Sequence, residues 1–349
     1  MKPAIRPTTP DDGPQIARFL SEIFSKSPDD PALDQKLLAW KYWAGSLHWP
    51  GSRSFVLARG ETILAHAGVV PGTMAWRGGQ ARAAHIIDWA ARPGAIGAGT
   101  ALMKHVAKMT DALIGIGGSD QTQAVLPTLG FRPAGTAVGF VRTLHPLRRI
   151  GAARRWSWRS GPHLARNLLW ALTAPGARAA GCSIDRLEAD ACGRVTLPES
   201  PLRGAALLMK RSPEQLYHLL QCPGLALQLY EVRHPGRGSR GYFVLAHAPR
   251  QIRLVDCWID SGEPTDWRLL FEAVVLTGLN EASAAELVTW SSDPAECEVL
   301  RRCGFHQRSS QPVRILPSQG TEIPDGTLRV EMVDNDAAYL GGGSADFWA

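Results

Sequence analysis

A glycine-rich run at residues 94–100, Gly94-Ala95-Ile96-Gly97-Ala98-Gly99-Thr100, has the clearest chemical signature in the sequence. An apolar segment at residues 83–90 precedes the run and predicts a strand, and residues 101–107 follow it with the pattern of a helix. Glycine allows the backbone to approach a ligand closely, and a helix N-terminus carries partial positive charge. The run therefore predicts a binding site for a phosphate or pyrophosphate, to which the Thr100 hydroxyl would add a contact. A plain Gly/Ala-rich turn is the alternative.

Two common phosphate-binding motifs do not fit this run. A Rossmann fingerprint occupies the first strand–helix turn of its domain and has an acidic ribose ligand about 20 residues later. Here three strand-like segments come first, and Asp111, which lies 12 residues after Gly99, is followed by a strand instead of ending one. A Walker A loop needs Lys followed by Ser or Thr directly after its glycines, and no Lys follows these.

The segments after the glycine run point to a different family. Residues 111–118 predict a short buried strand that ends in glycines, residues 120–128 predict a helix, and Leu129-Gly130-Phe131 follows. This order resembles the GCN5-related N-acetyltransferase (GNAT) family, whose cofactor loop is Gln/Arg-x-x-Gly-x-Gly/Ala and in which Leu-Gly-Phe closes the helix after strand five. The resemblance implies that the loop amides bind the pyrophosphate of acetyl-CoA and that the pantetheine arm follows a splayed fourth strand.

The resemblance assigns the binding of acetyl-CoA, or a related acyl-CoA, to one continuous stretch. The residues concerned are Trp89, Ala90, Ala91, Arg92, Gly94, Ala95, Ile96, Gly97, Ala98, Gly99 and Thr100. In the register that fits the helix best, Gly97 and Gly99 take the family's glycine positions, and Gly94 stands where Gln or Arg is expected. A shift by two residues would instead put Arg92 on the basic position.

Transfer of an acyl group to an amine needs a base, an acid for the leaving thiolate and donors for the oxyanion. The predicted catalytic residues are Asp88 and His85 on the fourth strand, and Ser119 just after the fifth. Ser119 is nominated because the Tyr that often serves as general acid in the family is replaced by Leu126. His66 on the third strand is a weaker candidate. The alternative for the Asp and His residues is a structural role in the core.

Composition and length predict a globular protein of two domains. The chain has 349 residues, of which 45% are hydrophobic and 20% charged. Its six cysteines have no metal-ligand spacing, so they are expected to be reduced thiols, and no metal is expected. No run of 18 or more apolar residues and no signal-peptide pattern occur, so a cytoplasmic location is expected.

The second half of the sequence repeats the first in outline. Ala84–Asp88 corresponds to Ile252–Asp256, residues 55–58 resemble residues 243–246, and Leu129-Gly130-Phe131 corresponds to Cys303-Gly304-Phe305. In place of the glycine run the second copy has the acidic stretch at residues 261–266, which would repel a pyrophosphate. The predicted fold is α+β (mixed α/β), with a GNAT acyl-CoA-binding domain at 1–145, a linker at 146–200 and a degenerate GNAT-like domain at 201–349. Each domain is expected to be a mixed, mostly antiparallel sheet flanked by helices.

The linker is strongly basic. Between Gln121 and Ile184 the chain has nine Arg and no Asp or Glu, and residues 148–170 combine Arg with Trp. Such a segment suits a membrane surface, but a linker helix that packs across both domains is the simpler alternative. No nucleic-acid partner is expected, because no such motif is recognisable. The oligomeric state is left open by the sequence.

Together these patterns predict an enzyme that transfers an acyl group from acyl-CoA to a primary amine of a small molecule. An amino sugar or a cell-envelope precursor is the expected acceptor by analogy with similar two-domain proteins. The alternative is a non-catalytic CoA-binding or scaffold protein, which the missing Tyr and the degenerate second half favour.

Overall fold

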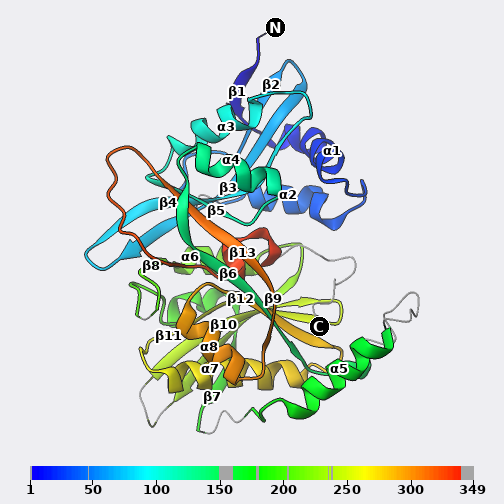
Figure 1. Cartoon of the computed structure of the whole chain (residues 1–349), viewed down its shortest axis with the longest axis vertical. Helices are drawn as coiled ribbons and strands as arrows, with labels where there is room; N and C mark the ends of the chain where they lie inside the picture. The colour runs from blue at the N-terminus through cyan, green and yellow to red at the C-terminus, as the bar shows by residue number, and fades with distance from the viewer. Residues whose placement is uncertain are drawn as a thin grey trace.

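One continuous mixed sheet runs through the molecule, and helices cover both of its faces (Figure 1). The computed structural model describes residues 2–45, 47–148, 160–177, 181–202, 204–234, 236 and 239–338. The strands lie in the order β1-β2-β3-β4-β5-β13-β6-β12-β11-β10-β9-β7, with β8 and β14 off this path. Along it, β4–β5 and β11–β12 are parallel pairs and the other pairs are antiparallel. The predicted fold class, a mixed and mostly antiparallel sheet flanked by helices, is confirmed.

The first half of the chain forms the end of the sheet that includes β1 to β5. Its strands are β1 (Ala4–Pro7), β2 (Ser54–Arg59), β3 (Thr62–Trp76), β4 (Gly79–Ala91), β5 (Ala112–Ile116) and β6 (Arg132–Thr143), and its helices are α1 (Gly13–Phe24), α2 (Gln35–Tyr42), α3 (Ala98–Ala107) and α4 (Asp120–Thr128).

Two layers of helix enclose this part of the sheet. The apolar stripe of α1 and the inner face of α2 pack with Ile87 and Ala90 of β4 in one core cluster. On the opposite face α3 and α4 pack with Ala84 of β4 and Leu113 of β5. Successive residues of β4 therefore point alternately toward the α1–α2 layer and the α3–α4 layer.

Strand β3 is longer than the two separate strands that its sequence, interrupted by Pro71-Gly72, would suggest at residues 63–70 and 73–77. It is a single strand that continues through Pro71-Gly72. Proline lacks the N–H that a sheet ladder needs. It is tolerated here because β2 stops pairing with β3 at Gly68 and β8 begins to pair only at Met74, so this edge of β3 has no partner strand at Pro71.

The second half forms the other end of the sheet. Its helices are α5 (Ser160–Thr173), α6 (Pro213–Leu220), α7 (Pro264–Asn280) and α8 (Pro294–Arg302), and its strands are β7 (Ser183–Leu187), β8 (Leu207–Met209), β9 (Ala226–His234), β10 (Ser239–Ala248), β11 (Gln251–Ile259), β12 (Glu286–Ser291), β13 (His306–Pro317) and β14 (Leu328–Arg329).

The internal repeat is visible in the topology, with one change of alignment. The antiparallel pair β10–β11 followed by the parallel pair β11–β12 matches β3–β4 followed by β4–β5. The match of residues 84–88 with 252–256 is consistent with this topology. Residues 243–246 lie in β10, which takes the place of β3. Their predicted correspondence to residues 55–58, which lie in β2, is therefore wrong. Short apolar strand sequences resemble one another, whereas hydrogen-bonded neighbours distinguish them.

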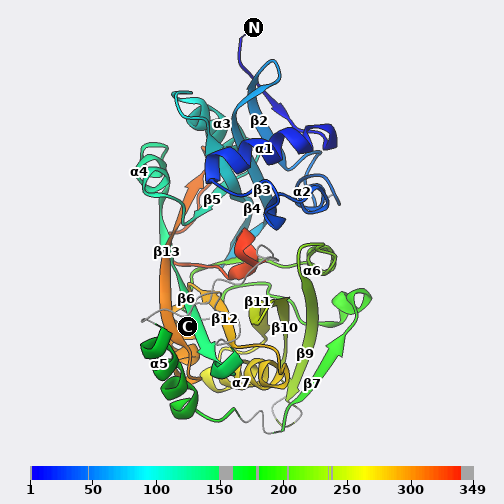
Figure 2. The same cartoon turned by 90° about the vertical axis from the view of Figure 1, so that its right-hand side faces the viewer.

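The two halves exchange strands where they meet. Strand β13, from the second half, lies between β5 and β6 and pairs antiparallel with both. Strand β6, from the first half, pairs with β12 on its other side. Figures 1 and 2 show these two long strands side by side along the middle of the molecule. Each half therefore completes its sheet with a strand that comes from the other half.

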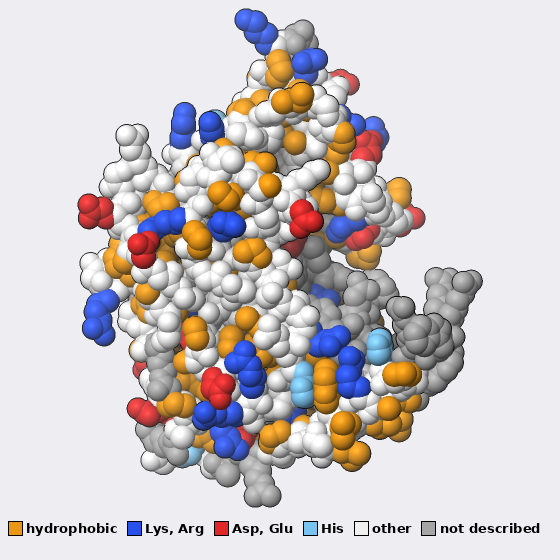
Figure 3. All heavy atoms as spheres, viewed as in Figure 1, with side chains coloured by type: hydrophobic (Ala, Val, Ile, Leu, Met, Phe, Trp, Pro, Cys, Tyr) orange, Lys and Arg blue, Asp and Glu red, His pale blue; other side chains and the backbone are white. Residues whose placement is uncertain are grey.

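The predicted linker region contributes secondary structure to the second half. Strand β7 pairs with β9, and the Trp170 ring of α5 stacks on His306 of β13 with ring centroids 3.8 Å apart. In Figure 3, apolar, basic and histidine side chains gather at the lower right, where Figure 1 places α5; Leu169 and Leu172 of α5 are exposed. No described helix is long and apolar enough to cross a membrane. The basic residues 149–159, part of the predicted membrane-surface segment, lie outside the described residues.

Residues 328–338, which we call the C-terminal segment, return to the junction of the halves. After β14 pairs with β8, Glu331 forms an isolated bridge with Ser291, and two short 3₁₀ turns follow. Figure 2 shows the turns, in red, between the two halves. The segment therefore places residues of the second half against the first.

Candidate functional site

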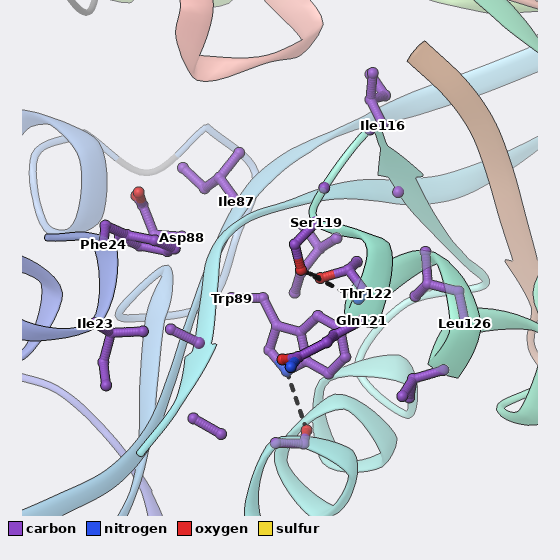
Figure 4. A pocket seen from close by; sticks show the side chains of 18 of the residues that line it. Ile23, Phe24, Ile87, Asp88, Trp89, Ile116, Ser119, Gln121, Thr122 and Leu126 are labelled. Atoms are coloured by element: carbon purple, nitrogen blue, oxygen red, sulfur yellow. Dashed lines mark hydrogen bonds between the residues drawn. The ribbon is translucent and has the colours of Figure 1, made fainter. Parts of the chain in front are cut away.

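The main cavity of the first half opens where β4 and β5 separate. Their parallel pairing covers only Ala83 to His85 of β4, and the following residues of β4 have no strand partner on that edge. A cavity of about 710 Å³ fills the gap. Ile23 of α1 lines it from one face of the sheet, and Leu126 of α4 lines it from the other (Figure 4). The cavity therefore passes through the sheet, so that two molecules could meet in it from opposite faces.

A bulge in β4 shapes this opening. Gly68 pairs with Ile87 and His66 pairs with Ala90, so two residues of β4, Asp88 and Trp89, face one residue of β3. Asp88 has φ +49°, a left-handed conformation that is costly for a residue with a side chain. The bulge places Trp89 on the α3–α4 side while Ile87 and Ala90 remain on the α1–α2 side.

Several side chains hold the bulge in place. The Asp88 carboxylate accepts hydrogen bonds from the Lys41 ammonium and, at 2.7 Å, from the Tyr42 hydroxyl. Burial acts to raise the pKa of Asp88, but Lys41 and Tyr42 outweigh it, and the pKa lies below its ordinary value. The buried His66 ring contacts the Asp88 carbonyl through Nδ1 at 2.9 Å and the Ser54 hydroxyl through Nε2 at 2.9 Å. Asp88, a predicted base, is thus a charged anchor of the strained backbone.

The second copy contains a matching anchor. On β11, Asp256 accepts a hydrogen bond from the Tyr242 hydroxyl at 2.7 Å and from Arg211 Nε at 3.1 Å. Strand β11 also has a bulge here, because its Asp256 and Leu254 pair with the consecutive residues Val244 and Leu245 of β10. Both copies hold an aspartate with one tyrosine and one cation, although only the first copy has the glycine run. The structural alternative weighed for Asp88 gains support from this symmetry.

The glycine run forms the turn between β4 and α3. Gly97 is the N-cap of α3 with φ +78°, and a Cβ on Gly99 would lie 3.2 Å from the Cβ of Ala91. The first glycine therefore permits the left-handed turn, and Gly99 permits close packing of α3 on β4. No hydrogen bond within the described chain uses the backbone N–H groups of Ile96, Gly97, Gly99 and Thr100. These amides and the helix dipole are placed where they could bind an anion at one end of the cavity.

The other predicted cofactor residues surround this turn with different exposures. Trp89 Nε1 donates to the Gly99 carbonyl at 3.1 Å, and its ring lies in the cavity (Figure 4). Trp89, Ala90, Ala91, Ala95, Gly97, Gly99 and Thr100 line the cavity. Arg92 is bound to Glu22 at 2.9 Å, and the Ile96 side chain is fully exposed. Gly94 belongs to the turn and Ala98 begins α3, and neither residue lines the cavity.

The second wall of the cavity comes from the end of β5 and the start of α4. Gly117 and Gly118 both have positive φ and lead into Ser119, whose hydroxyl caps α4 by accepting from the Thr122 N–H at 3.3 Å. Ser119 and Leu126 both line the cavity, on the α3–α4 side (Figure 4). The predicted acid Ser119 is therefore on the face where the α3 amides lie.

His85 faces a separate, smaller cavity. This cavity, of about 80 Å³, lies between the halves and is also lined by Trp40, Arg211 and Asp334. His85 is 2% exposed, and neither ring nitrogen has a hydrogen-bond partner within the described residues; Nε2 is 3.5 Å from Asp334 Oδ1. Burial lowers the pKa of His85 to about 4, so its ring is neutral at neutral pH. The structure brings Asp88 and Ser119 into one cavity and leaves His85 outside it.

Among the lining residues that the sequence did not predict are two polar residues from far along the chain. Asn335 and Asp336, from the C-terminal segment, line the main cavity of the first half. Burial and the nearby Asp88 raise the pKa of Asp336 above its ordinary value, against the opposing effect of Lys41 and Lys26. Only the Asp-Asn-Asp triplet at 334–336 marks this segment in the sequence, and nothing there relates it to residues 86–119. About 220 residues separate the two parts of the site.

The equivalent opening in the second half is filled. A cavity of about 10 Å³ remains there, lined by Trp258, Trp267 and Arg329. The Arg329 guanidinium lies over both indole rings and pairs with Glu296 and Glu331, of which Glu331 is 2.6 Å away. In the second half, side chains of the chain itself therefore fill this position. Among the described residues, no group of three or more His, Cys, Asp or Glu side chains is placed to hold a metal ion.

Comparison with solved structures identifies the fold, although no family model and no curated protein matches the sequence. A GCN5-related N-acetyltransferase from Anabaena variabilis is 13% identical, with a TM-score of 0.57, 90% of this chain covered and 72% of that chain. One from Kribbella flavida is 12% identical, with a TM-score of 0.57 and the same coverage. Saccharomyces cerevisiae N-myristoyltransferase with bound myristoyl-CoA is 14% identical, with a TM-score of 0.56, 90% of this chain covered and 82% of that chain. The chain therefore has the GNAT fold, as the order of its glycine run, strands and Leu-Gly-Phe predicts.

Proposed function

We propose that this protein is an acyltransferase that transfers an acyl group from acyl-CoA to a primary amine. The observation that carries the proposal is the cavity through the sheet, with the free amides of the α3 N-terminus on one side of it. An anion at those amides and an acyl group in the gap between β4 and β5 would fit this shape. The solved structures with the same fold include N-acetyltransferases and an N-myristoyltransferase.

In this proposal the amides of Ile96, Gly97, Gly99 and Thr100 hold the pyrophosphate, and Thr100 adds its hydroxyl. The acyl-CoA supplies the thioester carbonyl that the amine attacks. The bulge at Asp88 fixes the unpaired backbone groups of β4 that face the gap, where they can stabilise an oxyanion without reorganising. Lys41 and Tyr42 keep Asp88 charged and in place, and Ser119 is the candidate donor to the departing thiolate. Small amines are the proposed acceptors, and amino sugars are the first class to test.

The second half has a supporting role in this proposal. Its own opening is occupied by Arg329 and two indole rings, so we assign cofactor binding to the first half alone. This assignment predicts one bound acyl-CoA per chain.

Calorimetric titration with CoA, acetyl-CoA and longer acyl-CoAs tests the proposal. We expect one site per chain in the wild type and at least a tenfold loss of affinity in Gly97→Asp, because the carboxylate would repel the pyrophosphate and the residue would be strained at φ +78°. Gly51→Asp is the matched control: Gly51 is exposed, has φ +81° and open space around its Cβ, and lies outside the cavity. Equal affinities for the two variants would refute the site. Binding without transfer to any amine would instead support the CoA-binding scaffold alternative.

A further inference from the structure

The C-terminal segment brings a carboxylate from the second half into the cavity of the first. Asp336 is half-buried and lines this cavity beside Asn335. Its carboxylate accepts a hydrogen bond from its own backbone N–H. It has no hydrogen bond or ion pair with any other described residue. In Figure 4 the faint red ribbon of this segment lies above Ile87 and Asp88, on the face of the sheet opposite Ser119 and Leu126.

The segment is anchored firmly enough to position this side chain. The Val330 N–H donates to the Ser292 hydroxyl at 2.7 Å, and the Glu331 N–H donates to Asp334 Oδ2 at 2.9 Å. Asp334 in turn accepts from Arg211 Nη2 at 3.0 Å. These contacts tie the segment to β12 and to the junction of the halves immediately before Asp336.

The charges that face Asp336 come from three elements. Asp88 lies on β4, Lys41 on α2, and Lys26 just after α1. Lys41 is already engaged in an ion pair with Asp88. Burial and Asp88 therefore prevail and raise the pKa of Asp336, which brings it closer to the pH at which a base accepts protons efficiently.

Resting on the proposed acyltransferase function, we propose that Asp336 is the general base for the acceptor amine. The amine would enter from the α1–α2 face, while the α3 amides hold the acyl donor on the other. Asp88 is less suited to this role because Lys41 and Tyr42 both donate to its Oδ2 and hold its pKa below the ordinary value. His85 is excluded by position, because it faces the smaller cavity.

Asp336 takes one proton from the substrate ammonium and passes it to solvent. The freed nitrogen lone pair forms the bond to the carbonyl carbon and displaces the thiolate, which leaves with the electron pair of the C–S bond. A second proton leaves the nitrogen and ends on the sulfur. The products are the amide, the free thiol of CoA and one proton.

The test compares Asp336→Asn with the wild type, using the acyl-CoA that binds best in calorimetry and a panel of amines that includes glucosamine. We expect kcat to fall by at least about 100-fold, with acyl-CoA affinity unchanged. The acidic limb of the wild-type pH–rate profile should disappear, and Asp336→Glu should restore part of the rate. Asp260→Asn, which removes an exposed carboxylate of the second half, should behave as wild type.

A second readout does not depend on turnover. Because the folded protein raises the pKa of Asp336, its ionised form costs stability at neutral pH, and Asp336→Asn should raise the midpoint of urea unfolding at pH 7.5. If Asp336→Asn keeps the wild-type rate and the acidic limb of the pH–rate profile, the inference is overturned while the acyltransferase proposal stays intact. A wild-type protein that neither binds an acyl-CoA nor acylates an amine would overturn both.

Discussion

The buried imidazole of His85 should make the protein lose stability in mild acid. Its ring is 2% exposed, and no described residue donates to it or accepts from it. Burial lowers the pKa of His85 to about 4, and Arg211 adds to this shift although Asp334 opposes it. In the unfolded chain the pKa would be near its ordinary value of about 6.5. As the pH falls, the His85 ring is therefore protonated in the unfolded chain at a higher pH than in the folded protein.

The size of this effect follows from linkage between proton binding and folding. At pH 7.5 His85 is neutral in both states and contributes almost nothing. At pH 5 the unfolded ring is about 97% protonated and the folded ring about 9%, which lowers the free energy of unfolding by ~2 kcal/mol. The stability is thus present above the unfolded pKa and is lost as the pH falls toward 4.

The assay is urea unfolding of wild type and His85→Gln at pH 7.5 and at pH 5. Gln keeps a polar group of similar length but cannot be protonated, so the variant should lose ~2 kcal/mol less than wild type over this interval. The pKa of His218 is also lowered to about 4, chiefly by burial, so some acid sensitivity should remain. Equal losses for the two proteins would refute the reasoning and would mean that solvent reaches the His85 ring.

Two further predictions concern buried charges. Arg329→Met should lower the free energy of unfolding, measured by urea titration, by about 3–5 kcal/mol, because it leaves two buried glutamates without their cation. As a control, Arg302→Met on the exposed side of α8 should lower it by under about 1 kcal/mol. Lys41→Met should also cost about 3–5 kcal/mol because it leaves the Asp88 carboxylate buried and unpaired. Adding Asp88→Asn to that variant should recover part of the loss, and strictly additive effects in this double-mutant cycle would contradict the anchor role.

Much of the first-half site could be predicted because its parts are adjacent in the sequence. The strand before Gly94, the glycine turn and the helix after it lie within about 25 residues, and local backbone preferences determine their order. The Leu129-Gly130-Phe131 turn after α4 is similarly local. These elements sufficed to predict the fold class and the glycine turn that leads from β4 into α3.

The parts that were missed depend on contacts between distant residues. Nothing local indicates that β13 lies between β5 and β6, or that Asp336 reaches the cavity. The surroundings of Asp88 were equally hidden, because its partners Lys41 and Tyr42 lie more than 40 residues earlier on α2. A sequence pattern can nominate a carboxylate, but only its neighbours decide whether it accepts protons or anchors the backbone.

The strand exchange sets an order of events during synthesis. Strand β5 leaves the ribosome early, but its partner β13 ends at Pro317, about 200 residues later. At typical translation speeds of about 5–20 residues per second, the edge of β5 waits roughly 10–40 s for its neighbour. An unpaired strand edge invites pairing with other chains, so this interval is when nascent protein most needs protection by chaperones. A ribosome that stalls within the second half would release a product with an open sheet edge and without Asp336.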